Sequence, residues 1–334
     1  MNNLPHNSQP DVPVQRLITP GQYRPPDPVK GRWIFEDQIA ANTRGTYLLM
    51  AIFIVLLTLI VWAVGEQFAR SYAYLLAVVA AVVTFFTSYY SYYNSDKLVL
   101  SMSHARPATK TEFPHLINTL EGLTLAAGLP MVPKAYVIDD SAPNAFATGR
   151  DPQHAAVAVT TGLLDKLDRY ELEGVLAHEL SHVANRDILL STIAAVLVGT
   201  IVLLSDWAMR SFWFGGGRRR DSRDNEGGGN AIGIVIALLA IILAPIIAQL
   251  LRLAVSRRRE YLADANAIKL TRYPEGLAGA LEAIANDHEP LEVANKATAH
   301  LYIANPLQDT AGWVNSLFST HPPMAQRIAR LRAM

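Results

Sequence analysis

The sequence predicts a mostly helical membrane protein that carries an α+β domain outside the bilayer. Two observations lead to this fold class. The chain of 334 residues is 51% hydrophobic with a mean hydropathy of +0.17, and its apolar residues are concentrated in four blocks without a charged side chain. Between the second block and the third, apolar residues change from helical spacing to short strand-like runs and back to helical spacing.

The first 45 residues are expected to form a flexible N-terminal tail. They are polar and contain seven prolines before residue 29, so they cannot build a hydrophobic core. A secretory signal peptide is not expected, because this polar stretch precedes the first apolar block.

The four apolar blocks are expected to be transmembrane helices, since each can cross a hydrocarbon core of about 30 Å. In chain order they are Thr46 to Val64, Ser71 to Tyr93, Ile188 to Ser205 and Asn230 to Leu251. The first two form a hairpin over residues 46–93, because only a short segment connects them. The second pair occupies residues 188–251 and is joined by a loop rich in glycine and arginine.

A small sheet flanked by helices is expected outside these blocks. Short β-prone runs separated by turn residues predict three strands. The predicted strands are Ala135 to Asp139, Asn144 to Gly149 and Ala155 to Thr160. Helical spacing of apolar residues predicts the surrounding helices. The predicted helices are Thr111 to Leu125, Leu163 to Leu167, Glu171 to Ala184, Tyr273 to Asn286 and His321 to Arg332.

The helix over Glu171 to Ala184 carries the most informative motif, His178-Glu179-Leu180-Ser181-His182. Histidines four residues apart share one face of a helix, so both imidazoles can bind one tetrahedral zinc ion. Zinc lowers the pKa of a water that it binds to roughly 7, and Glu179 can then take the proton as a general base. The alternative is an ordinary polar turn of a helix.

A catalytic zinc site needs a third protein ligand. Glu260 is the best candidate, and Asp264 lies one helical turn further on, where it can accept an N–H from a ligand histidine. We favour His178 as that histidine. Because arginines precede Glu260, the alternative is a solvated, charged helix end. The other histidines, His300 among them, have no patterned partner.

Together the two motifs resemble those of the HtpX-type membrane zinc metallopeptidases, relatives of the CAAX prenyl endopeptidases. The resemblance extends over residues 95 to 334 in motif order. It implies one zinc ion per chain bound by His178, His182 and Glu260, with Glu179 as the base. It also implies a zincin-like catalytic domain, in which a small sheet lies beside the H-E-x-x-H helix.

Two further segments resemble the same family. His321-Pro322-Pro323 followed by Arg327 matches its C-terminal motif, which implies that His321 and Arg327 stabilise the developing oxyanion. A rigid turn before an amphipathic helix is the alternative. Asn144, Ala145 and Phe146 begin a segment that resembles the edge strand on which the family's peptide substrates lie. An ordinary hairpin strand is the alternative there.

Convergence of the three ligands on one ion constrains the topology. The ligands must lie on one side of the membrane, so residues 188–251 cross it twice or not at all. The catalytic domain is then built from residues 94–187 and residues 252–334. Basic residues beside the apolar blocks, such as Arg44 and Lys97, place the zinc on the cytoplasmic side of the plasma (inner) membrane. The triple arginine at residues 218–220 argues against that orientation.

Composition excludes other classes. The absence of cysteine removes disulfides and thiolate zinc ligands and fits a reducing compartment. The 29 basic and 29 acidic residues balance, so the chain has no nucleic-acid footprint.

The sequence therefore predicts an integral-membrane zinc endopeptidase. Its protein substrates are expected to be membrane proteins or segments close to the lipid bilayer, because His182 lies only a few residues before the third block. The resemblance implies quality control of damaged or misfolded membrane proteins. Two alternatives stay open, namely a CAAX-type processing protease and a zinc-stabilised membrane scaffold or chaperone without turnover.

Overall fold

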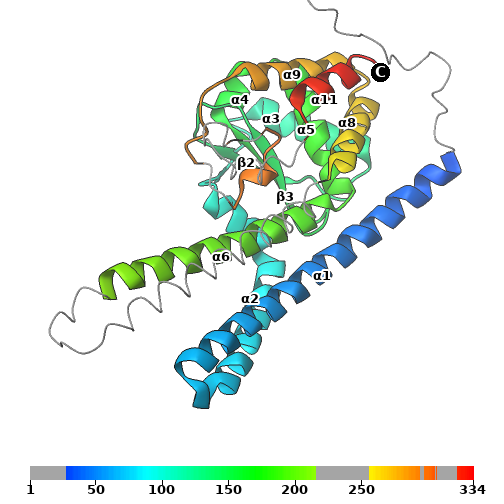
Figure 1. Cartoon of the computed structure of the whole chain (residues 1–334). Coiled ribbons are helices and arrows are strands. Elements are labelled where there is room, and N and C mark those ends of the chain that lie inside the picture. Colours follow the sequence, from blue (N-terminus) through cyan, green and yellow to red (C-terminus); the bar gives the residue numbers. More distant parts are fainter. Residues whose placement is uncertain (1–27, 216–255, 294–296, 305, 307–321) are drawn as a thin grey trace, which may run out of the picture. The chain divides into compact units, whose positions relative to one another are not determined.

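The computed structural model describes residues 28–215, 256–293, 297–304, 306 and 322–334. Its elements are labelled in Figure 1. The helices are α1 (Pro28–Phe68), α2 (Ala73–Met102), α3 (Pro114–Ala127), α4 (Thr161–Lys166), α5 (Arg169–Ala184), α6 (Asp187–Gly215), α8 (Arg257–Thr271), α9 (Pro274–Asn286) and α11 (Met324–Leu331). The strands are β1 (Arg106–Pro107), β2 (Lys134–Ile138), β3 (Ala145–Gly149) and β4 (Ala155–Thr160), and 3-10 turns lie at η1 (Arg70–Tyr72) and η3 (Ala299–Leu301).

The four strands form one mixed sheet in the order β1-β2-β4-β3. β2 runs parallel to β4 with Val137 opposite Val159, and β3 runs antiparallel to β4 with Phe146 opposite Ala158. The three predicted strands are confirmed to within one residue at each end. β1 was not predicted, because two residues are too few to show an alternating pattern. β3 lies at the edge of the sheet.

Both faces of the sheet are buried, because successive side chains point to opposite sides of a strand. Ala147 and Val157 face a hydrophobic cluster built from α3, α5, α8, α9 and α11. Phe146 and Ala158 face the other cluster, which contains the end of α2 and part of α6. The sheet thus lies between the helices of the metal-binding motifs and the helices that carry apolar blocks.

Helix α5 is fixed at its start and along its length. The side chain of Asp168 accepts hydrogen bonds from the N–H groups of Tyr170 and Glu171, and the Glu171 carboxylate accepts one from Asp168 N–H. This capping box satisfies N–H groups that the first turn leaves without a helical partner. Further along, Gly174 lets α9 approach closely, since a Cβ there would lie 2.7 Å from the backbone nitrogen of Leu277.

Two helices among the described residues are long and apolar enough to cross a membrane on their own. They cover Ile39–Gln67 in α1 and Arg70–Met102, which contains α2. Large apolar side chains along them are exposed, including Leu59, Val79 and Phe86, as expected of a surface that faces lipid. Helix α1 begins at Pro28, so residues 28–45, the last part of the predicted tail, are helical.

The predicted third transmembrane block differs from the first two. The start of α6 is buried inside the protein, with Ile193, Ala194 and Val198 at most 1% exposed. Helices α5 and α6 meet at 87°, and only together do they qualify as a bent span. The prediction of four transmembrane helices is therefore not confirmed. Its fourth block, Asn230 to Leu251, lies outside the described residues.

Replacing Gly174 with alanine should destabilise the protein by about 1–3 kcal/mol, because the added methyl group overpacks the contact between α5 and α9. Gly122→Ala is the matched control. Gly122 lies exposed in α3, and a Cβ there meets no atom within 4 Å. That variant should be more stable by about 0.5–1 kcal/mol, since alanine is the better helix former. Denaturant unfolding in detergent measures the free energy of unfolding of both variants. Equal changes in the two variants would contradict the close approach of α9 to Gly174.

Candidate metal centre

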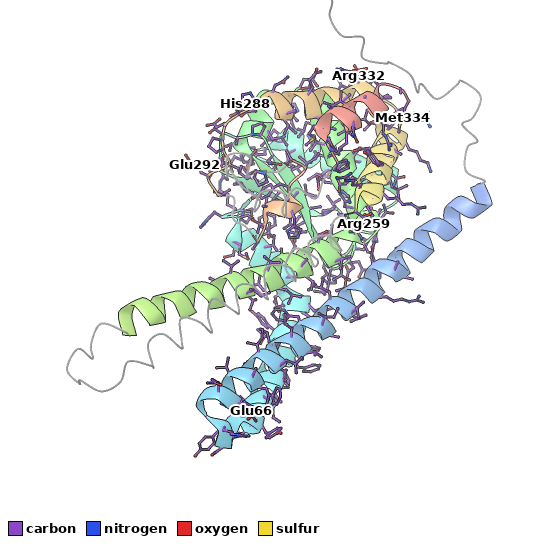
Figure 2. All side chains as sticks on the ribbon, viewed as in Figure 1. Glu66, Arg259, His288, Glu292, Arg332 and Met334 are labelled. Carbon is purple, nitrogen blue, oxygen red and sulfur yellow. The ribbon has the colours of Figure 1, made fainter. Side chains whose placement is uncertain are left out.

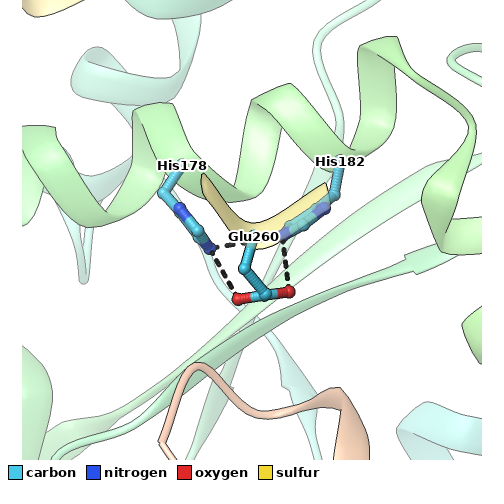
Figure 3. Close-up of side chains that lie close together, drawn as sticks. All are labelled: His178, His182 and Glu260. Atoms are coloured by element: carbon cyan, nitrogen blue, oxygen red, sulfur yellow. Dashed lines mark hydrogen bonds and ion pairs between the residues drawn. The ribbon is translucent and has the colours of Figure 1, made fainter. Parts of the chain in front are cut away.

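His178 and His182 lie one turn apart on α5, and Glu260 extends toward them from the first turn of α8 (Figure 3). The two Nε2 atoms are 3.2 Å apart, and the Glu260 carboxylate oxygens lie 3.7 Å and 3.6 Å from them. Two nitrogens bound about 2.05 Å from one tetrahedral zinc ion would be ~3.3 Å apart. The arrangement of the three side chains therefore fits a zinc ion.

The outer nitrogen of each imidazole is paired with a carboxylate. His178 Nδ1 lies 3.0 Å from Asp264 Oδ1, and His182 Nδ1 lies 3.1 Å from Asp187 Oδ2. A proton shared with these carboxylates stays on Nδ1 and leaves the Nε2 lone pair for a metal. The structure thus places Asp264 beside His178, the partner predicted for it. It also adds Asp187, which the sequence analysis missed.

The position of Asp187 follows from the break between α5 and α6. Arg186 adopts a left-handed conformation with φ of 56°, and the chain then turns into α6. This turn brings the carboxylate of Asp187 back to the imidazole of His182. An acidic residue just after the motif was the available signal, but the direction in which the chain leaves α5 cannot be read from spacing.

Burial and charge set the protonation of the centre. Burial raises the pKa of Glu179, and the nearby Glu260 carboxylate adds to that increase, whereas His178 and His182 oppose it. For His182, burial acts to lower the pKa. The hydrogen bond to Asp187 and the charge of Glu260 outweigh burial and raise its pKa to about 9.

Arg327 reaches the centre from α11 and is completely buried. Its Nε and Nη2 donate to the two oxygens of Asp264 at 3.0 Å and 2.6 Å, and its Nη1 lies 3.7 Å from Glu260 Oε2. Burial acts to lower the pKa of Arg327, but the Asp264 carboxylate raises it, so the guanidinium stays charged. The second residue of the predicted pair, His321, lies outside the described residues.

The outer edge of β3 lies beside Glu179. The N–H of Ala147 is close enough to the Glu179 carboxylate to act to lower its pKa. Ala145 C=O accepts from Ile303 N–H at 2.9 Å, and Gly149 N–H donates to Thr192 Oγ1 at 3.2 Å. Backbone groups alternate in direction along an antiparallel strand, so these three residues face outward.

The same alternation decides where the predicted substrate-binding residues Asn144, Ala145 and Phe146 point. The backbone of Phe146 faces β4, and its ring is buried against Tyr302 with centroids 5.0 Å apart. The amide of Asn144 donates to Ala304 C=O at 3.0 Å. Ala145 is already bonded to Ile303. The strand on which substrate was expected to lie, along Asn144 to Thr148, is the edge strand, and its residue Ala147 lines the pocket around the metal centre.

His300 also lines the pocket around the centre, although its sequence offered no patterned partner. Its ring Nε2 lies 3.1 Å from the backbone carbonyl oxygen of Ser191 in α6. No sequence spacing predicts this contact, because 109 positions separate the two residues.

Comparison with known proteins identifies the family. A family model described as "Peptidase family M48" matches residues 110–334, which is more than half of the chain and includes every residue of the metal centre. The chain belongs to peptidase family M48. It is a metallopeptidase of this family, and the resemblance seen in its motifs is confirmed.

Relatives of this M48 peptidase match it over nearly their whole length. A "Protease HtpX homolog" of Dictyoglomus thermophilum is 52% identical over 300 residues, covering 90% of this chain and 95% of the relative. A protein with the same description from Caldanaerobacter subterraneus is 47% identical over 307 residues, covering 91% and 98%. The crystal structure of S. mikatae Ste24p matches with a TM-score of 0.45 and 19% identity, covering 90% of this chain and 66% of that chain.

Replacing Arg327 with leucine should destabilise the metal-free peptidase by about 3–5 kcal/mol, because the buried Asp264 carboxylate would lose its charged partner. Arg332→Leu is the control, since Arg332 is an exposed arginine at the end of the same helix (Figure 2) and its ion pairs with Glu275 and Glu282 are solvated. Denaturant unfolding compares the two variants. Equal stability would contradict a role for the buried pair.

Zinc binding at pH 7 should release about one proton per chain, because His182 is protonated in the metal-free protein and zinc needs the neutral ring. The raised pKa of His182 also stabilises the metal-free fold below about pH 6.5, its ordinary pKa. That contribution is lost as the pH rises through about 9. Calorimetric titrations with zinc in buffers of different ionisation enthalpy measure the number of protons released. An Asp187→Asn variant should release fewer protons on zinc binding. An enthalpy of zinc binding that does not depend on the buffer would contradict the prediction.

Proposed function

We propose that this M48 peptidase is an integral-membrane zinc endopeptidase that cleaves membrane proteins or segments close to the bilayer. The observation that carries the proposal is the convergence of His178, His182 and Glu260 within 4.8 Å, with Glu179 buried beside them. A metal site used only for structure would have four closed protein ligands and no need of an adjacent carboxylate.

Bound zinc would be held by the Nε2 atoms of the two histidines and the carboxylate of Glu260, and it would acidify water and polarise the scissile carbonyl. Glu179 takes a proton from the attacking water and then gives it to the leaving amine. Its raised pKa favours the protonated form that the second transfer needs. Asp264 and Asp187 keep the two imidazoles oriented with Nε2 toward the centre.

The substrate adds as a short strand beside β3. Ala147 is the outward-facing residue next to Glu179, and both line the same pocket. The neighbouring outward groups are already bonded to Ile303 and Thr192, which restricts pairing with a substrate to the stretch around Ala147. Recognition then depends on few backbone hydrogen bonds and mainly on the side chains that enter the pocket.

Arg327 acts in this scheme as a positioning residue. Its guanidinium is bonded to both oxygens of Asp264, and Asp264 in turn orients His178. Stabilisation of the oxyanion by Arg327 and His321 stays a prediction from the family resemblance.

Membrane substrates are supported by the direct attachment of the domain to a candidate span. Val99 and Leu100, near the end of α2, pack into the same cluster as the sheet residues Ile138 and Phe146. A domain attached in this way stays close to the bilayer. We place the zinc on the cytoplasmic side of the inner membrane from the basic residues Arg44 and Lys97, and we propose quality control of membrane proteins as the task.

Replacing Glu179 with glutamine should lower kcat/KM at least about 100-fold while zinc content is retained, because the amide cannot accept the proton. Glu173→Gln is the matched control, since Glu173 lies on the same helix outside the pocket. Cleavage of a membrane-anchored reporter by the purified protein in detergent provides the rate, and elemental analysis gives the zinc. Undiminished proteolysis in Glu179→Gln would remove this residue from the mechanism. Cleavage of soluble unfolded chains alone would remove the membrane substrates.

A further inference from the structure

A buried polar residue of α1 is hydrogen-bonded to residues near the two ligand histidines and to the residue that precedes Glu260. Asn42 is 4% exposed and lies near the start of the candidate span Ile39–Gln67. Its Nδ2 donates to Asp187 Oδ1 at 2.6 Å and to the backbone carbonyl of Asn185 at 3.2 Å. Its Oδ1 accepts from Arg259 Nη1 at 3.0 Å. The amide thus uses both its donors and its acceptor in contacts with other elements.

Two of these partners, Asp187 and Arg259, are next to a metal ligand. Asp187 is the carboxylate that pairs with His182 Nδ1 at 3.1 Å. Arg259 immediately precedes Glu260 in the first turn of α8, and Figure 2 labels it there. Asn42 therefore connects the element that supplies two histidines with the element that supplies the glutamate.

The contacts also show what the amide prevents. Arg259 Nε lies 3.7 Å from Asp187 Oδ1, so the guanidinium is a second positive group beside the carboxylate that pairs with His182 through Oδ2. Asn42 donates to Oδ1 and accepts from Arg259. It thereby occupies the oxygen nearer to the arginine and leaves Oδ2 for the imidazole. Without the amide, Asp187 can turn toward Arg259 and release Nδ1 of His182.

Packing alone does not account for an asparagine here. The same face of α1 carries Leu49 and Phe53, which pack against α6 in one cluster. Thr46, one turn from Asn42, is also buried, but its hydroxyl donates only to the Asn42 carbonyl of its own helix. A polar side chain in a membrane segment is costly unless it has a specific partner.

We propose that Asn42 is a positioning residue of the zinc centre, through which the candidate transmembrane helix α1 holds Asp187, and thereby His182, in the orientation that binds zinc. The inference rests on the proposed function, because it takes His178, His182 and Glu260 as the zinc ligands. Zinc affinity then depends on how α1 packs against the catalytic domain.

The test measures zinc affinity of the full-length protein in detergent by competition with a chelator, together with the absorption spectrum of the cobalt-substituted protein. Asn42→Leu and Asn42→Ser should each bind zinc about 10–100-fold more weakly, the usual effect of losing an outer partner of a ligand histidine. Their cobalt spectra should differ from that of the wild type. Asn42→Gln keeps an amide and should bind more tightly than Asn42→Leu. The control Thr46→Val removes a buried hydroxyl of the same helix face and should leave affinity and spectrum unchanged.

The outcomes separate positioning from packing. If Asn42 only fills space, the Asn42→Leu variant would bind zinc as tightly as the wild type and at least as tightly as Asn42→Gln. That result would overturn the inference. If Asn42→Leu does not fold, Asn42→Ser decides, and wild-type affinity in that variant has the same meaning. A His182→Ala variant that binds zinc as tightly as the wild type would instead overturn the proposed function. If His182→Ala loses zinc affinity and the Asn42 variants do not, this inference alone would be overturned.

Discussion

The whole structure depends on placing two imidazoles, a carboxylate and a general base together in a buried pocket. Buried charge is costly unless it is paired and hydrogen-bonded. Here Asp264 is bonded to both His178 and Arg327, and Asp187 pairs with His182. Each charge therefore has a partner contributed by a different helix. The centre can form only when α5, α6, α8 and α11 are packed together, which couples the metal site to the fold.

The architecture supplies this packing through one central helix. Helix α5 packs in one hydrophobic cluster with the sheet and with helices from the C-terminal part of the chain. Its histidines therefore have a fixed orientation. The abrupt turn at Arg186 then starts α6 with Asp187 pointing back toward His182. A straight continuation of α5 would have carried that carboxylate away from the imidazole. The bend that complicates the membrane topology is thus the feature that completes the site.

Helices that carry apolar blocks contribute to the centre. Helix α6 lies against β3, where Thr192 is bonded to the edge strand, and α1 reaches the centre through Asn42. The segment after η3 occupies another part of the same edge through Ile303. The pocket is therefore lined by elements from distant parts of the sequence.

The sequence by itself determined what depends on local spacing. A helical period places His178 and His182 on one face of their helix, and Glu260 and Asp264 on one face of a second helix. Short β-prone runs between turn residues located the strands. Only the tertiary structure decided that Asp187 pairs with His182, that Ala147 faces the pocket, and that the third apolar block is largely buried. Those features arise from contacts between residues far apart in the chain, and local spacing does not specify the direction in which separate elements pack.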